Sequence, residues 1–256
     1  MSNSILTPEL WLKQMYEGSD LTIEEIGVAP IVIGCWGYSL VEKMAEMTGG
    51  VRVERWLYGT RHPLFNGSIG GRTVSFSHYP NGAAGTVKIM EELRAAGAST
   101  FITLGWTGAL QSNMEIGDMV IPTGVVSDEG TSPNYVPETE SIRAHPRLVK
   151  TLAEESRNRE LTVHEGKVWS TDACYRETRE LVARYCGQGV LGVDFESAGV
   201  LAFGQYRDVR TANILVVSDK VAEQWAPGFR DQRHFESTMK GLDVMLAVAE
   251  DLLADD

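Results

Sequence analysis

The amino-acid sequence predicts an α/β fold, a three-layer α/β/α domain around a central mixed, mostly parallel sheet. Short apolar runs of strand character alternate with glycine-rich loops and helix-like segments, which is the pattern of such domains. The 256 residues suffice for one large domain and contain neither an internal repeat nor a low-complexity linker. We therefore expect residues 1–256 to form a single domain, with functional residues in loops beyond the strand ends.

The first half of the chain begins with a short helix. Trp11 and Met15 lie four residues apart and predict a helix over 8–18, and Gly49 and Gly50 end a second helix over 41–47. A glycine loop over 81–85 opens a third helix over 86–96. Strands are expected over 30–37, 51–58, 73–77 and 100–104, with a turn over 66–71. The strand over 100–104 is expected to end at the segment 105–108, which contains two glycines.

The second half repeats the alternation. Apolar runs predict strands over 118–126, 163–169, 190–193 and 211–217. Helices are expected over 146–157, 176–185, 197–206 and 235–253.

Composition and charge exclude several classes of function. The net charge of −12 leaves no basic patch for a nucleic-acid backbone, and no apolar run reaches membrane-spanning length. The three cysteines (Cys35, Cys174 and Cys186) lack metal or redox spacing, and the five histidines show no ligand spacing. We therefore expect a cytoplasmic protein that needs no metal and binds neither nucleic acid nor a membrane.

The segment 190–199, VLGVDFESAG, places two carboxylates between a strand end and a helix start. Glu196 has two interpretations, because a helix N-terminus stabilises an anion there and because a carboxylate at a strand end accepts hydrogen bonds from vicinal hydroxyls, as in a ribose site. Asp219 follows the apolar run 214–217, where partial desolvation would let it hold a proton, or it caps a turn. The glycine loops at 34–37 and 81–85 either cradle an anion or serve tight turns.

Six segments carry a family resemblance. They are TFITLGWTGAL (100–110) with IGDMVI (116–121), DEGTS with Tyr135 (128–135), STDACY (170–175), VDFESA (193–198) and VVSD (216–219). In this order the chain resembles the nucleoside phosphorylase family, which contains uridine phosphorylase, purine nucleoside phosphorylase and the methylthioadenosine nucleosidases. The resemblance runs from about residue 30 to the C-terminal helix. It implies a small-molecule nucleoside as substrate, no cofactor, and inorganic phosphate as a possible co-substrate.

The resemblance assigns two catalytic residues. Glu196 matches the glutamate that binds the ribose hydroxyls, and Asp219 matches the aspartate that protonates or hydrogen-bonds the leaving base. Phe195 stands where the family usually has a methionine beneath the sugar. We expect the other substrate-binding residues in the same segments and in the loop that follows, at Asp194, Ser218, Trp106, Thr107, Gly108, Cys174, Tyr175 and Trp225.

The acceptor side departs from the family. Thr103 replaces a phosphate-binding arginine, Trp106 replaces a serine or threonine that contacts phosphate, and Tyr38 stands where phosphorylases have a second arginine and nucleosidases a water-activating glutamate. Arg61 lies near an arginine that a neighbouring subunit lends. The acceptor candidates are Gly34, Tyr38, Arg61, Gly82 and Thr103. Because charge-assisted contacts to phosphate are lost, water is favoured as acceptor.

The base side departs as well. Cys174 replaces a phenylalanine that stacks on the base, so Trp106, Trp169 or Trp225 either supplies that surface or belongs to the core. The residues that read uracil should fall near Thr178 and Glu180 and are not kept, which favours a purine-type or modified base. Three hypotheses follow: a nucleoside hydrolase, a phosphorylase with a rebuilt phosphate site, and a nucleoside-binding protein without catalysis. Family members complete each site with a neighbour, so a homo-oligomer, at least a dimer, is expected.

Overall fold

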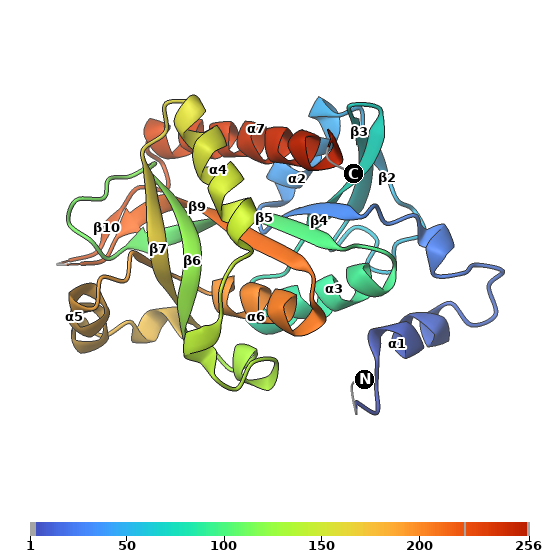
Figure 1. Cartoon of the computed structure of the whole chain (residues 1–256), viewed down its shortest axis with the longest axis horizontal. Coiled ribbons are helices and arrows are strands. Elements are labelled where there is room, and N and C mark those ends of the chain that lie inside the picture. Colours follow the sequence, from blue (N-terminus) through green and yellow to red (C-terminus); the bar gives the residue numbers. More distant parts are fainter. Residues whose placement is uncertain (1–3, 223, 255–256) are drawn as a thin grey trace.

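A computed structural model describes residues 4–222 and 224–254 as a mixed sheet covered by helices on both sides (Figure 1). The helices α2, α4 and α7 lie on one side of the sheet, and α3 and α6 lie on the other. The helices are α1 Pro8–Met15, α2 Tyr38–Met47, α3 Ala83–Ala95, α4 Pro146–Asn158, α5 Arg179–Gly187, α6 Ser197–Arg207 and α7 Gln232–Ala254. Short 3-10 helices are η1 Glu24–Ile26, η2 Ser132–Asn134, η3 Thr139–Ser141 and η4 Cys174–Arg176. This arrangement confirms the predicted fold class.

The sheet follows the order β10-β9-β6-β7-β8-β5-β1-β4-β3-β2, and β9 also pairs with β5. Its strands are β1 Ile31–Cys35, β2 Val51–Arg52, β3 Leu64–Ile69, β4 Arg72–His78, β5 Thr100–Ala109, β6 Met119–Asp128, β7 Val163–Thr171, β8 Gly192–Asp194, β9 Arg210–Lys220 and β10 Ala226–Pro227. The long pairings β5–β9 and β6–β7 are parallel, and β3–β4 is antiparallel.

Strand β5 is the centre of the sheet because it has three partners. Its first half pairs with β1 from Ile31↔Thr100 onward, its end pairs with β8 at Gly108↔Val193, and its other edge follows β9. The strands β5, β9, β6, β7 and β8 therefore close into a ring. The ends of β5, β8 and β9 come together at one rim of this ring.

Three predicted elements were wrong in part. The expected turn over 66–71 is mostly strand β3, and only Gly70 and Gly71 turn, both with positive φ. The expected strand over 51–58 ends after Arg52, because the chain turns so that Trp56 enters the core. The strand expected to end at 105–108 continues through these residues, since β5 reaches Ala109. Gly105 serves close packing there, since a Cβ would stand 2.9 Å from Cζ3 of Trp36.

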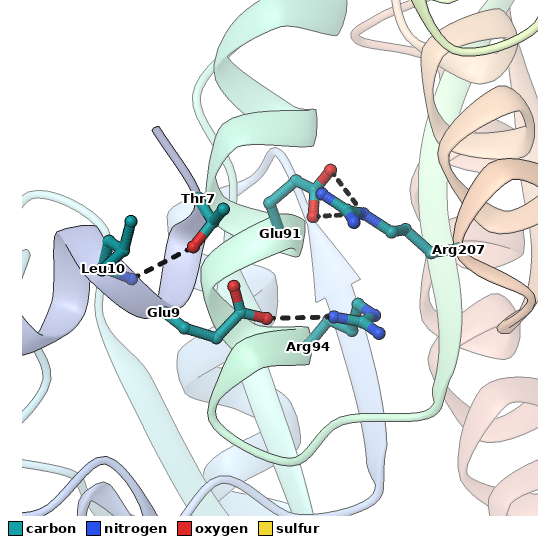
Figure 2. A network of polar contacts seen from close by, with 6 residues as sticks. All are labelled: Thr7, Glu9, Leu10, Glu91, Arg94 and Arg207. Atoms are coloured by element: carbon teal, nitrogen blue, oxygen red, sulfur yellow. Dashed lines mark hydrogen bonds and ion pairs between the residues drawn. The ribbon is translucent and has the colours of Figure 1, made fainter. Parts of the chain in front are cut away.

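Helices α3 and α6 are held together by close packing and an ion pair. A Cβ on Gly199 would stand 2.8 Å from Cβ of Ala83, so the two backbones approach closely. Nε of Arg207 donates to both carboxylate oxygens of Glu91, at 2.9 and 2.8 Å, and Nη1 of Arg94 donates to Glu9 of α1 at 3.3 Å (Figure 2). These contacts fix where the N-termini of α3 and α6 meet.

Helix α1 begins at a capped N-terminus. Thr7 Oγ1 accepts a hydrogen bond of 3.2 Å from the amide of Leu10, as Figure 2 shows. None of the described helices combines the length and apolar character required to cross a lipid bilayer.

Candidate active site

A cavity of about 690 Å³ opens at the rim where β5, β8 and β9 end. Its wall contains every residue that the sequence analysis named as catalytic or substrate-binding: Asp194, Phe195, Glu196, Trp106, Thr107, Gly108, Cys174, Tyr175, Ser218, Asp219 and Trp225. The volume is in the range of small-molecule sites. Segments more than a hundred residues apart in sequence thus form one site.

Glu196 lies between β8 and α6 and is almost fully buried. It occupies the N-cap position of α6, but its side chain makes no capping hydrogen bond in that helix, so the helix-cap interpretation was wrong. Its Oε1 accepts a hydrogen bond of 2.7 Å from the main-chain N–H of Gly82, which precedes α3. Burial, and next the charge of Asp194, raise the pKa of Glu196 to about 8.

Asp194 lies behind Glu196 in a buried hydrogen-bond network. It accepts hydrogen bonds from the hydroxyls of Ser170, at 2.5 Å, and of Ser197. Burial raises its pKa to about 6, while these hydrogen bonds act in the opposite direction. The network continues from Ser197, whose hydroxyl accepts from Nδ2 of Asn213 at 2.7 Å, to Thr103, which donates to Oδ1 of Asn213 at 2.9 Å.

Thr103 is therefore a buried member of this network and does not line the cavity. The space that the resemblance assigns to an arginine holds a neutral hydroxyl paired with an amide. No charge is presented to the cavity from this position.

Asp219 lies within β9, where it is paired with Gly108 of β5 and Pro227 of β10. It does not cap a turn, because the strand continues to Lys220. Its Oδ1 accepts a hydrogen bond of 2.7 Å from the hydroxyl of Ser218, and its Oδ2 accepts one of 2.9 Å from Nε1 of Trp225. A Cβ on Gly108 would stand 3.3 Å from Oδ2, so the glycine leaves room for this carboxylate.

None of the five acceptor candidates lines the cavity. Gly34 has a steric role, since a Cβ there would stand 2.0 Å from the Tyr79 ring. Gly82 already donates its N–H to Glu196, Tyr38 is partly exposed beside His78, and Arg61 is exposed. Exposure of Arg61 leaves its side chain free to reach a neighbouring molecule, as the resemblance implies.

Trp36 takes the place of these candidates in the cavity wall, and the sequence analysis missed it. Its ring packs on Gly105, and its Nε1 donates a hydrogen bond of 2.9 Å to the hydroxyl of Thr86 in α3. Trp106 also lines the cavity, whereas Trp169 is a core residue packed on Tyr185. Two indole rings, those of Trp36 and Trp106, thus form part of the cavity wall.

Glu177 and Arg179 also line the cavity and were missed. The sequence analysis considered their neighbours Thr178 and Glu180, which do not line it. The hydroxyl of Thr178 is turned to α5, because Thr178 is the N-cap of that helix and accepts a hydrogen bond from the amide of Leu181. Burial, and next the charge of Asp219, raise the pKa of Glu177 to about 7.

Metal ligation has no candidate in the described part of the chain. Among residues 4–222 and 224–254, no three His, Cys, Asp or Glu side chains are grouped closely enough to hold a metal ion. The cavity therefore offers carboxyls, hydroxyls, indole N–H groups and one guanidinium.

Comparison with known proteins places the chain among nucleoside enzymes. The model of the phosphorylase superfamily matches residues 32–253. Guanosine phosphorylase of Halorubrum lacusprofundi is 29% identical over 198 residues, covering 77% of this chain and 81% of that protein. A DeoD-type 2 purine nucleoside phosphorylase of Vibrio cholerae is 27% identical over 179 residues, covering 69% and 76%. The crystal structure of uridine phosphorylase from Vibrio fischeri ES114 has a TM-score of 0.77 and 25% identity, covering 91% and 95%.

Proposed function

Since the chain belongs to the phosphorylase superfamily and is a glycosyl-bond-cleaving enzyme of it, we propose that it cleaves the N-glycosidic bond of a purine-type or modified nucleoside and transfers the sugar to water. The observation that carries the proposal is that Glu196 and Asp219 face one cavity from adjoining strand ends. A nucleoside whose sugar is hydrogen-bonded to Glu196 then has its base near Asp219.

The reaction follows from these positions. Cleavage of the C1′–N bond leaves positive charge on the sugar and an electron pair on the base. Glu196 hydrogen-bonds the ribose hydroxyls and fixes the rotation of the ring, and its carboxyl oxygens place partial negative charge beside the cationic sugar. A carboxyl on the Asp219 side neutralises the departing base. Water adds to C1′ from the opposite face, and the products are free base and free pentose.

Water is supported as acceptor by the charges around the cavity. Of the described residues that line it, Arg179 alone is cationic, and it belongs to α5 beside Glu177 on the base side. On the acceptor side stand Trp36 and Trp106, and the Gly82 amide is already used. A phosphate dianion there would lose its hydration without a cationic partner, which is costly.

Phosphorolysis is the second candidate, and a specific observation favours it. The relatives named above are phosphorylases of guanosine, purine nucleosides and uridine. In that case the product is pentose 1-phosphate, and Arg61 of a second copy is the candidate phosphate partner. We also propose a cytoplasmic location, supported by the three unpaired cysteines, and a homo-oligomeric assembly.

The test is a nucleoside panel incubated with and without phosphate. We expect free base to form at a rate nearly independent of phosphate, with free pentose as the second product. Pentose 1-phosphate as the main product would establish phosphorolysis, and Arg61→Ala should then raise the Michaelis constant for phosphate more than that for the nucleoside. Absence of cleavage under both conditions would contradict both candidates and leave nucleoside binding alone.

A further inference from the structure

Glu177 is a half-buried carboxyl in the wall of the cavity that none of the steps above uses. It lies between η4 and α5, in the loop that follows β7, and it faces the same cavity as Asp219. The two side chains interact electrostatically. The cavity therefore holds two carboxyls on its base side, contributed by different elements.

The main chain of Glu177 caps η4, but its side chain has no hydrogen-bonded role among the described residues. The N-cap of α5 is Thr178, and the loop backbone is held by hydrogen bonds from Arg176 N to Ala173 O, at 2.7 Å, and from Thr178 N to Arg176 O, at 2.8 Å. Within residues 4–222 and 224–254, no side chain or main-chain N–H donates a hydrogen bond to the Glu177 carboxyl. A partly desolvated carboxyl without a partner is a group that a ligand can satisfy.

Asp219 differs from Glu177 in its hydrogen bonds. Both of its oxygens already accept a hydrogen bond from the protein, one from Ser218 and one from Trp225. Each oxygen of Asp219 is thus already an acceptor, and neither hydrogen bond requires a proton on Asp219. Next to burial, the charge of Asp219 disfavours ionisation of Glu177, because a like charge in the same cavity opposes a second one.

We propose that Glu177, rather than Asp219, is the catalytic acid that protonates the leaving base, and that burial and, next, the Asp219 carboxylate keep this proton on Glu177. The proposal rests on the proposed N-glycosidic cleavage. When the C1′–N bond breaks, its electron pair stays on a ring nitrogen, which takes the proton from the Glu177 carboxyl. Water supplies hydroxide to C1′, and its remaining proton, returned through solvent, restores Glu177.

The charged groups around Glu177 agree with this assignment. Asp219 of β9 faces it with negative charge, Arg179 of α5 lines the same wall, and Asp194 and Glu196 lie across the cavity beside β8. Burial is the larger cause of the raised pKa of Glu177 and Asp219 the second, so Glu177 carries a proton up to about pH 7.

The first experiment compares Glu177→Gln with wild type on two kinds of substrate. On a purine nucleoside, kcat/KM should fall at least about a hundredfold, the usual contribution of a general acid. On 4-nitrophenyl riboside, whose leaving group needs no proton, it should change by less than about threefold. Glu180→Gln is the matched control. Glu180 lies three residues after Glu177, in the first turn of α5, and is an exposed carboxylate that does not line the cavity.

The pH profile separates the two carboxyls. In wild type, kcat should fall as the pH rises through about 7, where Glu177 loses its proton. Glu177→Gln should lack this limb, whereas Asp219→Asn should keep it at lower pH, because removal of the Asp219 charge lowers the pKa of Glu177. A limb that survives in Glu177→Gln and disappears in Asp219→Asn would overturn the proposal and make Asp219 the acid.

An infrared measurement gives a readout that does not need turnover. A protonated carboxyl band should be present slightly below neutral pH in wild type and in Asp219→Asn, and Glu177→Gln should remove one such carboxyl. An unchanged band in Glu177→Gln would overturn the assignment of the proton. If the band behaves as expected but wild type cleaves no nucleoside, both the proposed function and the role of Glu177 as proton donor are refuted. If wild type and Glu177→Gln cleave the nucleoside equally well, only the role of Glu177 as proton donor is refuted.

Discussion

The main-chain N–H of Gly82 lies 2.7 Å from Oε1 of Glu196 and donates a hydrogen bond to it. This contact joins the start of α3 to the start of α6, two helices that the Glu91–Arg207 ion pair also holds together. An amide at a helix N-terminus commonly binds an anion from solution. Here the amide of Gly82 binds the carboxyl of Glu196, so it orients the group proposed to bind the sugar. The same amide is then not free to bind a phosphate or a water molecule that attacks the sugar.

Replacement of Glu196 tests its role at the sugar. Glu196→Gln should lower turnover by at least about tenfold, equivalent to about 1.4 kcal/mol, because the neutral amide stabilises the cationic sugar less. The fold should persist, since Oε1 of glutamine still accepts from Gly82. Steady-state kinetics with free-base detection and a thermal melt give the two readouts. The exposed Glu138→Gln serves as control, and unchanged turnover in Glu196→Gln would exclude Glu196 from the site.

The raised carboxyl pKa values predict how stability depends on pH. The pKa of Glu196 is about 8 in the folded protein against 4.5 for the free side chain, and that of Glu177 is about 7. The folded state therefore binds more protons than the unfolded state, and the free energy of unfolding should decrease as the pH rises through this interval. The lowered pKa values of His62 and His78 act in the opposite direction, but only as the pH rises to about 6.5.

Thermal melts of the ligand-free protein between about pH 6.5 and 8.5 measure this effect. We expect a decrease of at least about 1 kcal/mol, or about 2–4 °C in Tm. Glu196→Gln should flatten the curve, because a residue without a titrating proton contributes no slope. Equal slopes in the two proteins would show that Glu196 ionises in the folded state as it does in water.

A steric role for Gly34 predicts a loss of stability. Gly34→Ala would place a methyl group 2.0 Å from the buried Tyr79 ring, and such overpacking costs about 1–3 kcal/mol or more. We expect a lower Tm and less soluble protein. Gly187→Ala is the matched control, since nothing lies within 4 Å of a Cβ at that glycine. A normal Tm with reduced activity in Gly34→Ala would instead return Gly34 to the acceptor site.

Assembly into an oligomer is the fourth prediction. Arg61 is exposed and does not line the cavity of its own chain, which is what a residue that completes a neighbour's site requires. Light scattering at micromolar concentration should give at least twice the chain mass of 28.2 kDa. A mass near 28.2 kDa would refute this and leave Arg61 without a site.

The sequence was sufficient for the fold class and for part of the cavity wall, because apolar runs mark strands and the polar residues after them gather at one rim. Glu196 and Asp219 each follow such a run, and the structure brings both to the cavity. Gly105 misled the prediction, since a glycine that ends a strand and a glycine that admits a neighbouring ring look alike in sequence.

Trp36 and Glu177 could not be placed from sequence for a related reason. The position of Trp36 depends on the contact of its ring with Gly105 and on a hydrogen bond to Thr86, fifty residues away. Glu177 faces the cavity because α5 begins with Thr178 as its N-cap. A helix that began one residue earlier or later would turn a different side chain toward the cavity. Boundaries of that accuracy are the part of a secondary-structure prediction that sequence patterns determine least well.

The closed ring of strands determines the order in which parts of the chain can fold during synthesis. Strand β5 is complete once residue 109 has been synthesised, yet its partners β8 and β9 end at residues 194 and 220. Until those partners emerge from the ribosome, the second half of β5 is an unpaired edge of apolar and small residues, the kind of surface that promotes aggregation. Chains that end before residue 210 lack β9 and with it Asp219, so the wall of the cavity is incomplete in them.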